Sequence, residues 1–421
     1  MRTLDDLDVS AKRVLLRADL NVPLREEPGH GQSVADDARI KAALTTIEEL
    51  RGRGASIVLV SHLGRPHDHE PDLSMQPVSQ QISALTGARV TLAPAVVGPE
   101  VQSLVERLKP GEIVMLENVR YEPGEMKNDP DLARELANLA DVYVNDAFGS
   151  AHRAHASTEG VAHLLPCAAG RLMQREVRAL TEVLERPARP LVAVLGGAKV
   201  SDKIALVEHF LEIADSVLIG GAMSFPFLAA QGHAVGASPC AESDVDCARQ
   251  VFAKSAEAHH NLELPEDLIV AERLSADAQR RTTATPDVPE GWRGLDIGPL
   301  TAGHYGRRIA QAGTVFWNGP MGAFECDPFA LGTRVIAQAL AGTSATTVAG
   351  GGETVQALRE LGLESSVDHV STGGGATLEF LQGLGLPGVR ALSSTAAGGD
   401  RLDARRGAQN TVSPSPSGVL G

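Results

Sequence analysis

Residues 191–204 read L-V-A-V-L-G-G-A-K-V-S-D-K-I and contain the structural unit that recurs along the chain. Five apolar residues lead into Gly196-Gly197, and a polar stretch then opens an amphipathic segment, 203–214. A short apolar run bounded by glycine is typical of a strand buried on both faces of a parallel sheet. The stretch therefore predicts a strand, a glycine turn and a helix, in that order.

The same alternation of short apolar runs and longer amphipathic segments recurs on both sides of this stretch. We expect strands at residues 14–16, 57–60, 113–116, 142–144, 191–194, 217–219, 268–270, 314–317, 347–349 and 369–371. We expect helices at residues 37–53, 99–108, 131–140, 203–214, 241–261 and 329–341. Strands that alternate with helices indicate an α/β fold with a mostly parallel sheet.

The strands are too many for one modest open sheet, so the chain needs a point of division. The helical stretch 171–186, followed by Pro187 and Pro190, supplies one. We predict two doubly wound (Rossmann-like) parallel-sheet domains, 1–170 and 171–379, joined by an interdomain helix and hinge. A single large barrel is also compatible with the periodicity. Residues 393–421 are rich in Ser, Thr, Gly, Pro and Arg, and we expect a disordered tail there.

The composition sets limits on the class of protein and on its partners. The chain has 421 residues, a net charge of −15 and 43% hydrophobic residues, which suits a globular protein of roughly two to three domains. Net acidity disfavours non-specific binding of nucleic acid or anionic membranes, but it does not disfavour a small anion. The longest uncharged stretch, 216–232, is short for a membrane span. Four cysteines without a C-x-x-C pair, and a start that lacks a signal-peptide pattern, predict a cytoplasmic protein.

Polar residues follow four predicted strands in the first half of the chain. In open α/β sheets, ligands bind beyond the carboxyl ends of the strands. Arginine forks match phosphate and carboxylate oxygens, so the pattern predicts a site for a small polyanion, although a surface ion pair would explain any single arginine. His152 and His155 lack a third metal ligand, and we interpret them as loop histidines rather than a zinc site. The segments are R-A-D-L-N-V-P (17–23), S-H-L-G-R-P (61–66), E-N-V-R (117–120) and N-D-A-F-G-S-A-H-R-A-H (145–155), with Arg39 at a helix start.

Glycine-rich turns follow the predicted strands in the second half. They lie at residues 196–203, 220–223, 318–322, 350–354 and 373–375. Glycine lets backbone N–H groups approach phosphates, and a helix N-terminus favours an anion. Lys199 and Lys203 would share one face if a helix begins here. The pattern predicts a nucleotide site, while the missing P-loop and G-x-G-x-x-G motifs disfavour a P-loop NTPase and a dinucleotide oxidoreductase.

Taken together, these motifs resemble the phosphoglycerate kinase family. The resemblance covers nearly the whole chain up to about residue 390, in the order that the family shows. It implies a glycolytic kinase that transfers a phosphoryl group reversibly between 1,3-bisphosphoglycerate and Mg-ADP, giving 3-phosphoglycerate and ATP, by hinge closure of two domains. The matching segments are 17–24, 36–40, 61–66, 116–121, 145–158, 196–204, 220–232, 296–299, 317–325 and 369–381.

The resemblance also implies a role for each matching residue, with Arg39, Lys199 and Lys203 as the catalytic residues. The substrate-binding positions are Asp19, Leu20, Asn21, Arg39, His62, Leu63, Gly64, Arg65, Arg120 and Arg153. The nucleotide-binding positions are Lys199, Lys203, Asn318, Glu325, Gly350, Gly351, Gly352, Glu353 and Thr354, with Glu325 at the ribose. Gly373 and Gly374 fall where the family contacts the phosphate in transfer.

The expected metal is Mg²⁺, and Glu353 is the expected protein ligand. The family usually has Asp at this position, so the oxygen ligand here is one methylene longer. The resemblance further implies that residues 380–392 pack on the first domain. We expect a monomer whose partners are 3-phosphoglycerate, 1,3-bisphosphoglycerate, ADP and ATP, with no nucleic acid or membrane partner. Two alternatives are a catalytically weak relative kept for binding or regulation, and a nicotinamide oxidoreductase.

Overall fold

The computed structural model describes residues 1–27, 29, 31–201, 203–255 and 261–393, and it divides the chain into two compact units. The first unit holds Met1–Ala147, Arg153–Met173 and the described residues from Pro387 onward. The second holds Phe148–His152 and Gln174–Leu386. Helix α5 (Arg171–Glu185) begins in the first unit and continues in the second. Of the predicted tail, 393–421, only Ser393 is described, and it ends a 3-10 turn (Ala391–Ser393).

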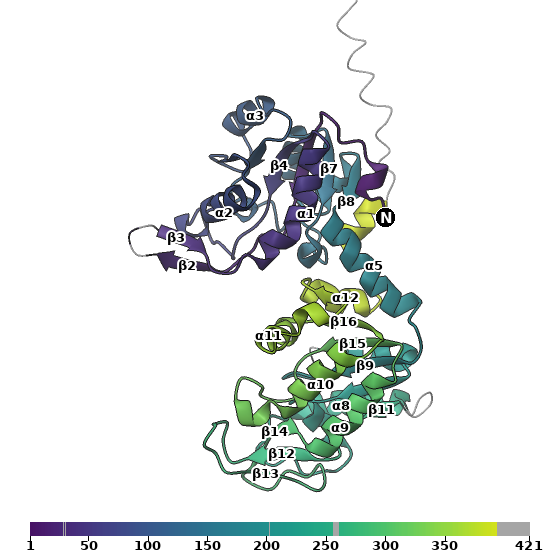
Figure 1. The fold of residues 1–421 in the computed structure, drawn as a ribbon. Helices are drawn as coiled ribbons and strands as arrows, with labels where there is room; N and C mark the ends of the chain where they lie inside the picture. The colour runs from purple at the N-terminus through teal and green to yellow at the C-terminus, as the bar shows by residue number, and fades with distance from the viewer. Residues whose placement is uncertain (28, 30, 202, 256–260, 394–421) are drawn as a thin grey trace, which may run out of the picture. The chain divides into compact units, whose positions relative to one another are not determined.

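A six-stranded parallel sheet forms the centre of the first unit (Figure 1). The strand order is β5-β6-β4-β1-β7-β8, so the chain winds outward in both directions from β1. Ligands of doubly wound sheets bind where this direction switches, at the carboxyl ends of the central strands. The strands are β1 (Arg13–Arg17), β4 (Ser56–Val60), β5 (Val90–Leu92), β6 (Ile113–Met115), β7 (Val142–Asn145) and β8 (Cys167–Ala169).

Helices α1 (Ala38–Gly52) and α2 (Gln76–Thr86) pack on one face of this sheet. Their apolar side chains join those of β1 and β4 in one core, in which Ile40 and Ile47 of α1 meet Leu16 and Ile57 of the strands. Strand periodicity places Arg17 on the opposite face from Leu16. The unit also contains α3 (Pro99–Glu106), α4 (Pro130–Asn138), α13 (Pro387–Arg390) and a hairpin of β2 (Leu24–Glu27) and β3 (Gly31–Val34).

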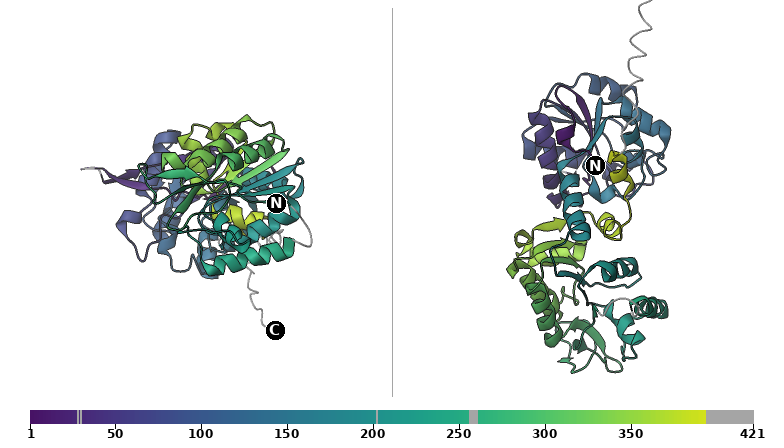
Figure 2. Two further views of the ribbon diagram at one scale, coloured as in Figure 1. Left: turned by 90° about the horizontal axis from the view of Figure 1, so that it is seen from below. Right: turned by 90° about the vertical axis from the view of Figure 1, so that its right-hand side faces the viewer.

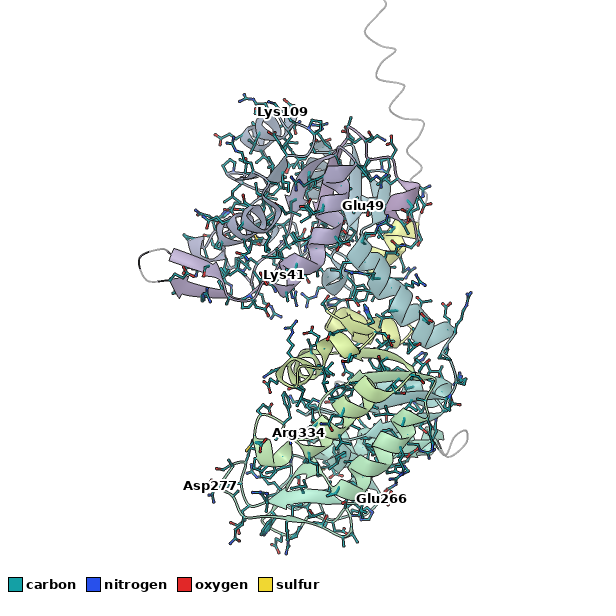
Figure 3. The ribbon with its side chains drawn as sticks, viewed as in Figure 1. Lys41, Glu49, Lys109, Glu266, Asp277 and Arg334 are labelled. Atoms are coloured by element: carbon teal, nitrogen blue, oxygen red, sulfur yellow. The ribbon has the colours of Figure 1, made fainter. Side chains whose placement is uncertain are left out.

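The end of the described chain is attached to the start of the first unit. The N–H of Arg2 donates to the carbonyl of Leu392 at 3.2 Å, and the buried Cys167 thiol lies 3.9 Å from the carbonyl of Ala391. Arg171, the first residue of α5, pairs with Glu49 of α1 at 2.7 Å (Figure 3). The stretches of chain that precede Gln174 and follow Leu386 are therefore held within the first unit by local contacts.

The second unit has its own six-stranded parallel sheet, in the order β11-β10-β9-β15-β16-β17. Helices lie on both of its faces, as the right-hand view of Figure 2 shows. Apolar residues of α9, α10 and α11 share one core with β9, β15 and β16. The ring of Phe210 in α6 stacks on the ring of Phe316 in β15, with 5.2 Å between the ring centroids. The strands are β9 (Leu191–Leu195), β10 (Ser216–Ile219), β11 (Leu262–Glu263), β15 (Thr314–Asn318), β16 (Thr346–Gly350) and β17 (His369–Ser371).

Several helices of this unit, among them α6, α7, α11 and α12, follow glycine turns that end strands. Each of these turns leads into a helix whose first N–H groups have no intrahelical partner. The helices in the described part of the unit are α6 (Ile204–Ile213), α7 (Ser224–Ala230), α8 (Glu242–Ser255), α9 (Pro299–Ala310), α10 (Leu331–Gly342), α11 (Gly352–Glu360) and α12 (Gly375–Leu381).

The predicted fold class is confirmed, because each unit carries a doubly wound parallel sheet. The alternative of a single barrel is wrong. The run 268–270 was also assigned wrongly to a parallel sheet: β12 (Leu268–Ala271) lies between β13 (Arg280–Thr282) and β14 (Arg293–Ile297) in a small antiparallel sheet. A short apolar run does not reveal the direction of its neighbours.

No helix in the described part of the chain has the length and apolarity needed to cross a membrane.

Candidate active site

An ion pair joins the end of β1 to the start of α1 in the first unit. Arg39, the second residue of α1, places Nη1 2.9 Å from Oδ1 of Asp19. Burial is the largest single influence on Asp19 and opposes its ionisation, but the neighbouring positive charges, Arg39 first among them, together with a hydrogen bond from Asn21, hold the pKa of Asp19 below its ordinary value. The N–H of Asn21 also donates to Asp19 Oδ1, at 3.3 Å. Asp19 therefore stays ionised and orients Arg39.

The loop 61–66 after β4 is held against the loop after β1. The N–H of Gly64 donates to Oδ1 of Asn21 at 2.8 Å. Buried Asn118, which belongs to the predicted segment 117–120 but was assigned no role of its own, exchanges two hydrogen bonds with the backbone of Leu63, at 3.2 and 2.7 Å. The side chains of Leu20 and Leu63 are buried in the core, and the N–H of Leu20 donates to Ser61 Oγ at 2.9 Å, so these two predicted residues shape the loops rather than contact a ligand with their side chains.

Several arginines lie close enough to act on one another. The pKa of Arg120 is lowered first by burial and then by the charges of Arg17, Arg153 and Arg65. Arg120 also donates to the carbonyl of Gly64 at 2.5 Å, whereas Arg65 and Arg153 are exposed. Like charges repel one another and attract an anion, so this arginine cluster is suited to a ligand with several negative oxygens.

His62 is a neutral member of this site. It is 5% exposed, and its pKa lies well below the ordinary value of 6.5 because burial, and then the charge of Arg17, disfavour protonation. Arg17 is the last residue of β1 and is 1% exposed. Its Nη2 atom lies 3.1 Å from Nδ1 of His62. Arg17 begins the segment 17–23, which the sequence placed at the predicted anion site, but no individual role was assigned to it.

The ammonium group of Lys203 is hydrogen-bonded to backbone carbonyls in the glycine turns of the second unit. Its Nζ donates to the carbonyls of Gly196 at 2.6 Å and Asn318 at 3.2 Å. Helix α6 begins at Ile204, after both lysines, so the expectation that Lys199 and Lys203 share a helix face is wrong. Lys199 is exposed in the turn, where its ammonium is available to a ligand.

Two glycine turns are joined by the side chains of Asn318 and Thr354. Asn318 Nδ2 donates to the carbonyl of Gly350 at 2.8 Å, and the N–H of Gly319 donates to Thr354 Oγ1 at 2.6 Å. Gly351 has φ of 94°, and a Cβ there would lie 2.8 Å from Asn318 Nδ2, so the turn requires glycine. Asn318 and Thr354 are buried, which makes them supports for the turns rather than exposed contacts.

A cavity of about 250 Å³ opens within the second unit beside these turns. Its wall is largely apolar and glycine-rich, with Phe225, Leu268 and Met321 among its side chains. Glu325 and Glu353 contribute carboxylates to the same cavity. An apolar cavity with a few polar groups at its edge is typical of a small-molecule site. Gly373 and Gly374, also predicted, precede α12, and Gly374 has φ of 55°.

The donor set around Glu353 bears on the expected Mg²⁺. Glu353 is exposed in the first turn of α11, and no group of three or more His, Cys, Asp or Glu side chains suited to a metal occurs within the described ranges. Mg²⁺ commonly takes one or two carboxylates, with phosphates and waters as its other ligands. The single carboxylate therefore fits a metal that arrives with a nucleotide rather than a resident metal centre.

Comparison with known proteins identifies the family. A family profile described as Phosphoglycerate kinase matches residues 4–384. The chain belongs to the phosphoglycerate kinase family. The phosphoglycerate kinases of Moorella thermoacetica and Rubrobacter xylanophilus are each 50% identical to it over 392 residues, which cover 93% of this chain and 98% of either relative.

Solved structures of the family agree with this assignment. Phosphoglycerate kinase from Coxiella burnetii matches with a TM-score of 0.85 and 40% identity, and the enzyme from Pyrococcus horikoshii with a TM-score of 0.80 and 31% identity. Each match covers 93% of this chain and 98% of the solved chain. The chain is therefore a kinase of glycolysis that transfers a phosphoryl group reversibly between 1,3-bisphosphoglycerate and ADP. Family membership excludes the alternative of a nicotinamide oxidoreductase.

Proposed function

We propose that the arginine cluster of the first unit binds 3-phosphoglycerate or 1,3-bisphosphoglycerate, and that the glycine turns of the second unit bind Mg-ADP or Mg-ATP. The observation that carries the first assignment is the gathering of Arg65, Arg120 and Arg153 at one place, where burial first, and then the charges of Arg17, Arg153 and Arg65, lower the pKa of Arg120. Such a cluster is favourable once an anion neutralises it.

The substrate-binding groups differ in what they offer. Exposed Arg65 and Arg153 supply guanidinium forks for the phosphate, and Arg120 lies beneath them as a partly buried charge. The carboxylate of Asp19 can accept a hydrogen bond from the substrate hydroxyl, and the amide of Asn21 can accept one or donate one. The backbones of Leu20, Leu63 and Gly64 shape the loop that carries His62.

Different groups of the second unit suit the base, the ribose and the phosphates of ADP. The apolar wall of the cavity suits the base, and Glu325 suits the ribose hydroxyls. The first N–H groups of α11, at Gly352 and Glu353, suit the phosphates because they have no intrahelical partner. Lys203 holds the turns together through Gly196 and Asn318, and Lys199 supplies the exposed charge.

The chemistry needs positioning and charge neutralisation more than a strong base. The ADP oxygen that attacks the acyl phosphate is already ionised, and in reverse the attacking carboxylate is ionised at pH 7. Arg39 and Lys199 are our assignments for neutralising the phosphoryl group in transfer. Mg²⁺, when bound with the nucleotide, neutralises charge on the phosphate oxygens, and Glu353 is its proposed protein ligand. Of the two predicted glycines beside the transferring phosphate, Gly374 offers its backbone N–H at the start of α12, while the N–H of Gly373 donates to Ser371 Oγ at 3.3 Å and supports the turn.

ATP turnover with 3-phosphoglycerate and Mg²⁺ tests this function. We expect ADP formation that requires 3-phosphoglycerate, that stops when a chelator removes Mg²⁺, and that returns when Mg²⁺ is added in excess. A protein that folds but forms no ADP under these conditions contradicts the proposal, and turnover that persists in chelator contradicts the metal. We also propose a cytoplasmic monomer, and light scattering after size-exclusion chromatography measures its mass.

A further inference from the structure

All three nitrogens of the Arg17 guanidinium have defined partners, although the side chain is 1% exposed. Nε donates to Ser157 Oγ at 2.9 Å, Nη1 donates to the carbonyl of Ala18, and Nη2 lies 3.1 Å from His62 Nδ1. A guanidinium is always charged and has no acceptor atom. Arg17 is therefore the donor in every one of these bonds, and the plane of its fork is fixed.

Ser157, which orients this fork, is itself fixed by three bonds. Its Oγ donates to Glu125 Oε1 at 2.7 Å, and its N–H donates to Glu125 Oε2 at 2.9 Å. Its carbonyl accepts from the hydroxyl of Tyr143 at 2.8 Å. Glu125 is 1% exposed and Tyr143 is fully buried. The guanidinium of Arg17 is thus connected to the buried carboxyl group of Glu125 through the hydroxyl of Ser157. The hydrogen bonds of Ser157 to Glu125 and Tyr143 hold this hydroxyl in place.

This arrangement decides where His62 carries its proton. Because Arg17 only donates, Nδ1 must present its lone pair, and a neutral ring then carries hydrogen on Nε2. Four charged groups act on His62, namely Arg17, Asp19, Arg120 and Arg39, and after burial Arg17 acts most strongly. In the part of the chain that the structure describes, Nε2 has no hydrogen-bond partner.

We propose that Arg17 is a positioning residue that fixes His62 as the neutral Nε2–H tautomer, so that His62 donates a hydrogen bond to an oxygen of bound 3-phosphoglycerate. The inference rests on the proposed function of the arginine cluster and deepens it. Arg17 itself lies beneath the ligand site, with its nitrogens committed to protein partners. Its part is to hold the donor in place rather than to touch the substrate.

Nitrogen-15 NMR of histidine-labelled full-length protein without substrate reads the tautomer directly. The chain has 13 histidines, so the His62 signals are assigned by their absence in His62→Gln. We expect the wild type to show neutral Nε2–H from pH 6 to 8. In Arg17→Met we expect His62 to take up a proton at a higher pH than in the wild type, because the nearest positive charge is gone while burial remains.

Steady-state kinetics measures the consequence for the substrate. We expect Arg17→Met to raise the KM for 3-phosphoglycerate about tenfold, which is the effect of one misplaced hydrogen bond. We expect the KM for ATP to stay unchanged and kcat to change by less than about threefold. Arg13→Met is the matched control, because Arg13 begins the same strand and pairs with Asp141 at 3.3 Å. It should match the wild type in both experiments.

The outcomes separate this inference from the proposed function. A wild-type His62 that is cationic or protonated on Nδ1 overturns the inference, as does an Arg17→Met variant with unchanged signals or an unchanged KM for 3-phosphoglycerate. If Arg17→Met does not fold, Ser157→Ala removes the acceptor of Nε and should shift both readouts in the same direction. A wild type without 3-phosphoglycerate turnover overturns the proposed function and the donor role together, while the spectra still decide how Arg17 acts on His62.

Discussion

The Nη1 atom of Arg39 lies 2.9 Å from Oδ1 of Asp19, yet the Arg39 side chain is 40% exposed. One edge of the guanidinium is therefore oriented by the carboxylate, and the other remains accessible to an anion. We expect Arg39→Ala to lower kcat by about 10³-fold or more, because an arginine that neutralises a phosphoryl group in transfer contributes on this scale. A coupled assay with Mg-ATP and 3-phosphoglycerate measures the loss.

Lys41→Ala is the control for this prediction. Lys41 lies two residues further along the same helix, is exposed, and pairs with Asp37 at 2.9 Å (Figure 3). Its removal should leave kcat near the wild-type value. Near-normal turnover in Arg39→Ala would remove Arg39 from the mechanism.

Lys199 gives the second kinetic prediction. It is exposed in the turn before α6, whereas Lys203 is bound to the carbonyls of Gly196 and Asn318. We expect Lys199→Ala to lose most of kcat with little loss of folding stability. Lys254→Ala, which removes an exposed lysine paired with Glu208 at 2.6 Å, should keep full activity. If the two variants turn over equally fast, Lys199 has no catalytic part.

Patterns that depend on neighbouring residues were predicted well from the sequence. The run at 191–194 became β9, and the glycines at 350–352 became the end of β16 and the start of α11. Burial on both faces of a parallel sheet leaves a continuous apolar signature, and a tight turn leaves glycine. The two doubly wound sheets followed from these local signals.

Features that depend on distant partners could not be predicted in the same way. The sequence places Arg17 at a strand end of the predicted anion site, but it does not show that the Oγ of Ser157, 140 residues further along, accepts a hydrogen bond from its Nε. The run at 268–270 pairs with antiparallel neighbours that its own composition does not specify. The helix predicted at 203–214 forms at Ile204–Ile213, but the hydrogen bonds from Lys203 Nζ to the carbonyls of Gly196 and Asn318 are contacts that spacing alone does not show.

Glu353 gives a prediction about the metal. The exposed carboxylate lies in the first turn of α11, one methylene further from the backbone than an aspartate would be. We expect Glu353→Asp to lower the Mg²⁺ concentration needed for half-maximal turnover, because the shorter side chain loses less freedom on binding. Glu360→Asp, at the end of the same helix and bonded to Gln356 at 2.9 Å, is the control. An unchanged Mg²⁺ titration in Glu353→Asp contradicts this role.

Asp296 gives a prediction about stability and pH. Its carboxylate is 3% exposed and accepts from the N–H groups of Gly332 and Ile297, both at 2.9 Å. Burial outweighs these bonds and raises the pKa of Asp296 to about 7. The folded state therefore keeps a proton that the unfolded state has released above about pH 4, so this contribution to stability is present at low pH and lost as the pH rises through 7.

Urea unfolding of the wild type and Asp296→Asn between pH 5 and 8 isolates this contribution. The difference in the free energy of unfolding, wild type minus variant, should fall as the pH rises, by at most about 1.4 kcal/mol per pH unit. Asp277→Asn is the control, because Asp277 is exposed in the loop before β13 and should leave the pH dependence over this range unchanged (Figure 3). A difference that stays flat from pH 5 to 8 would mean that Asp296 is ionised throughout, held so by the first N–H groups of α10.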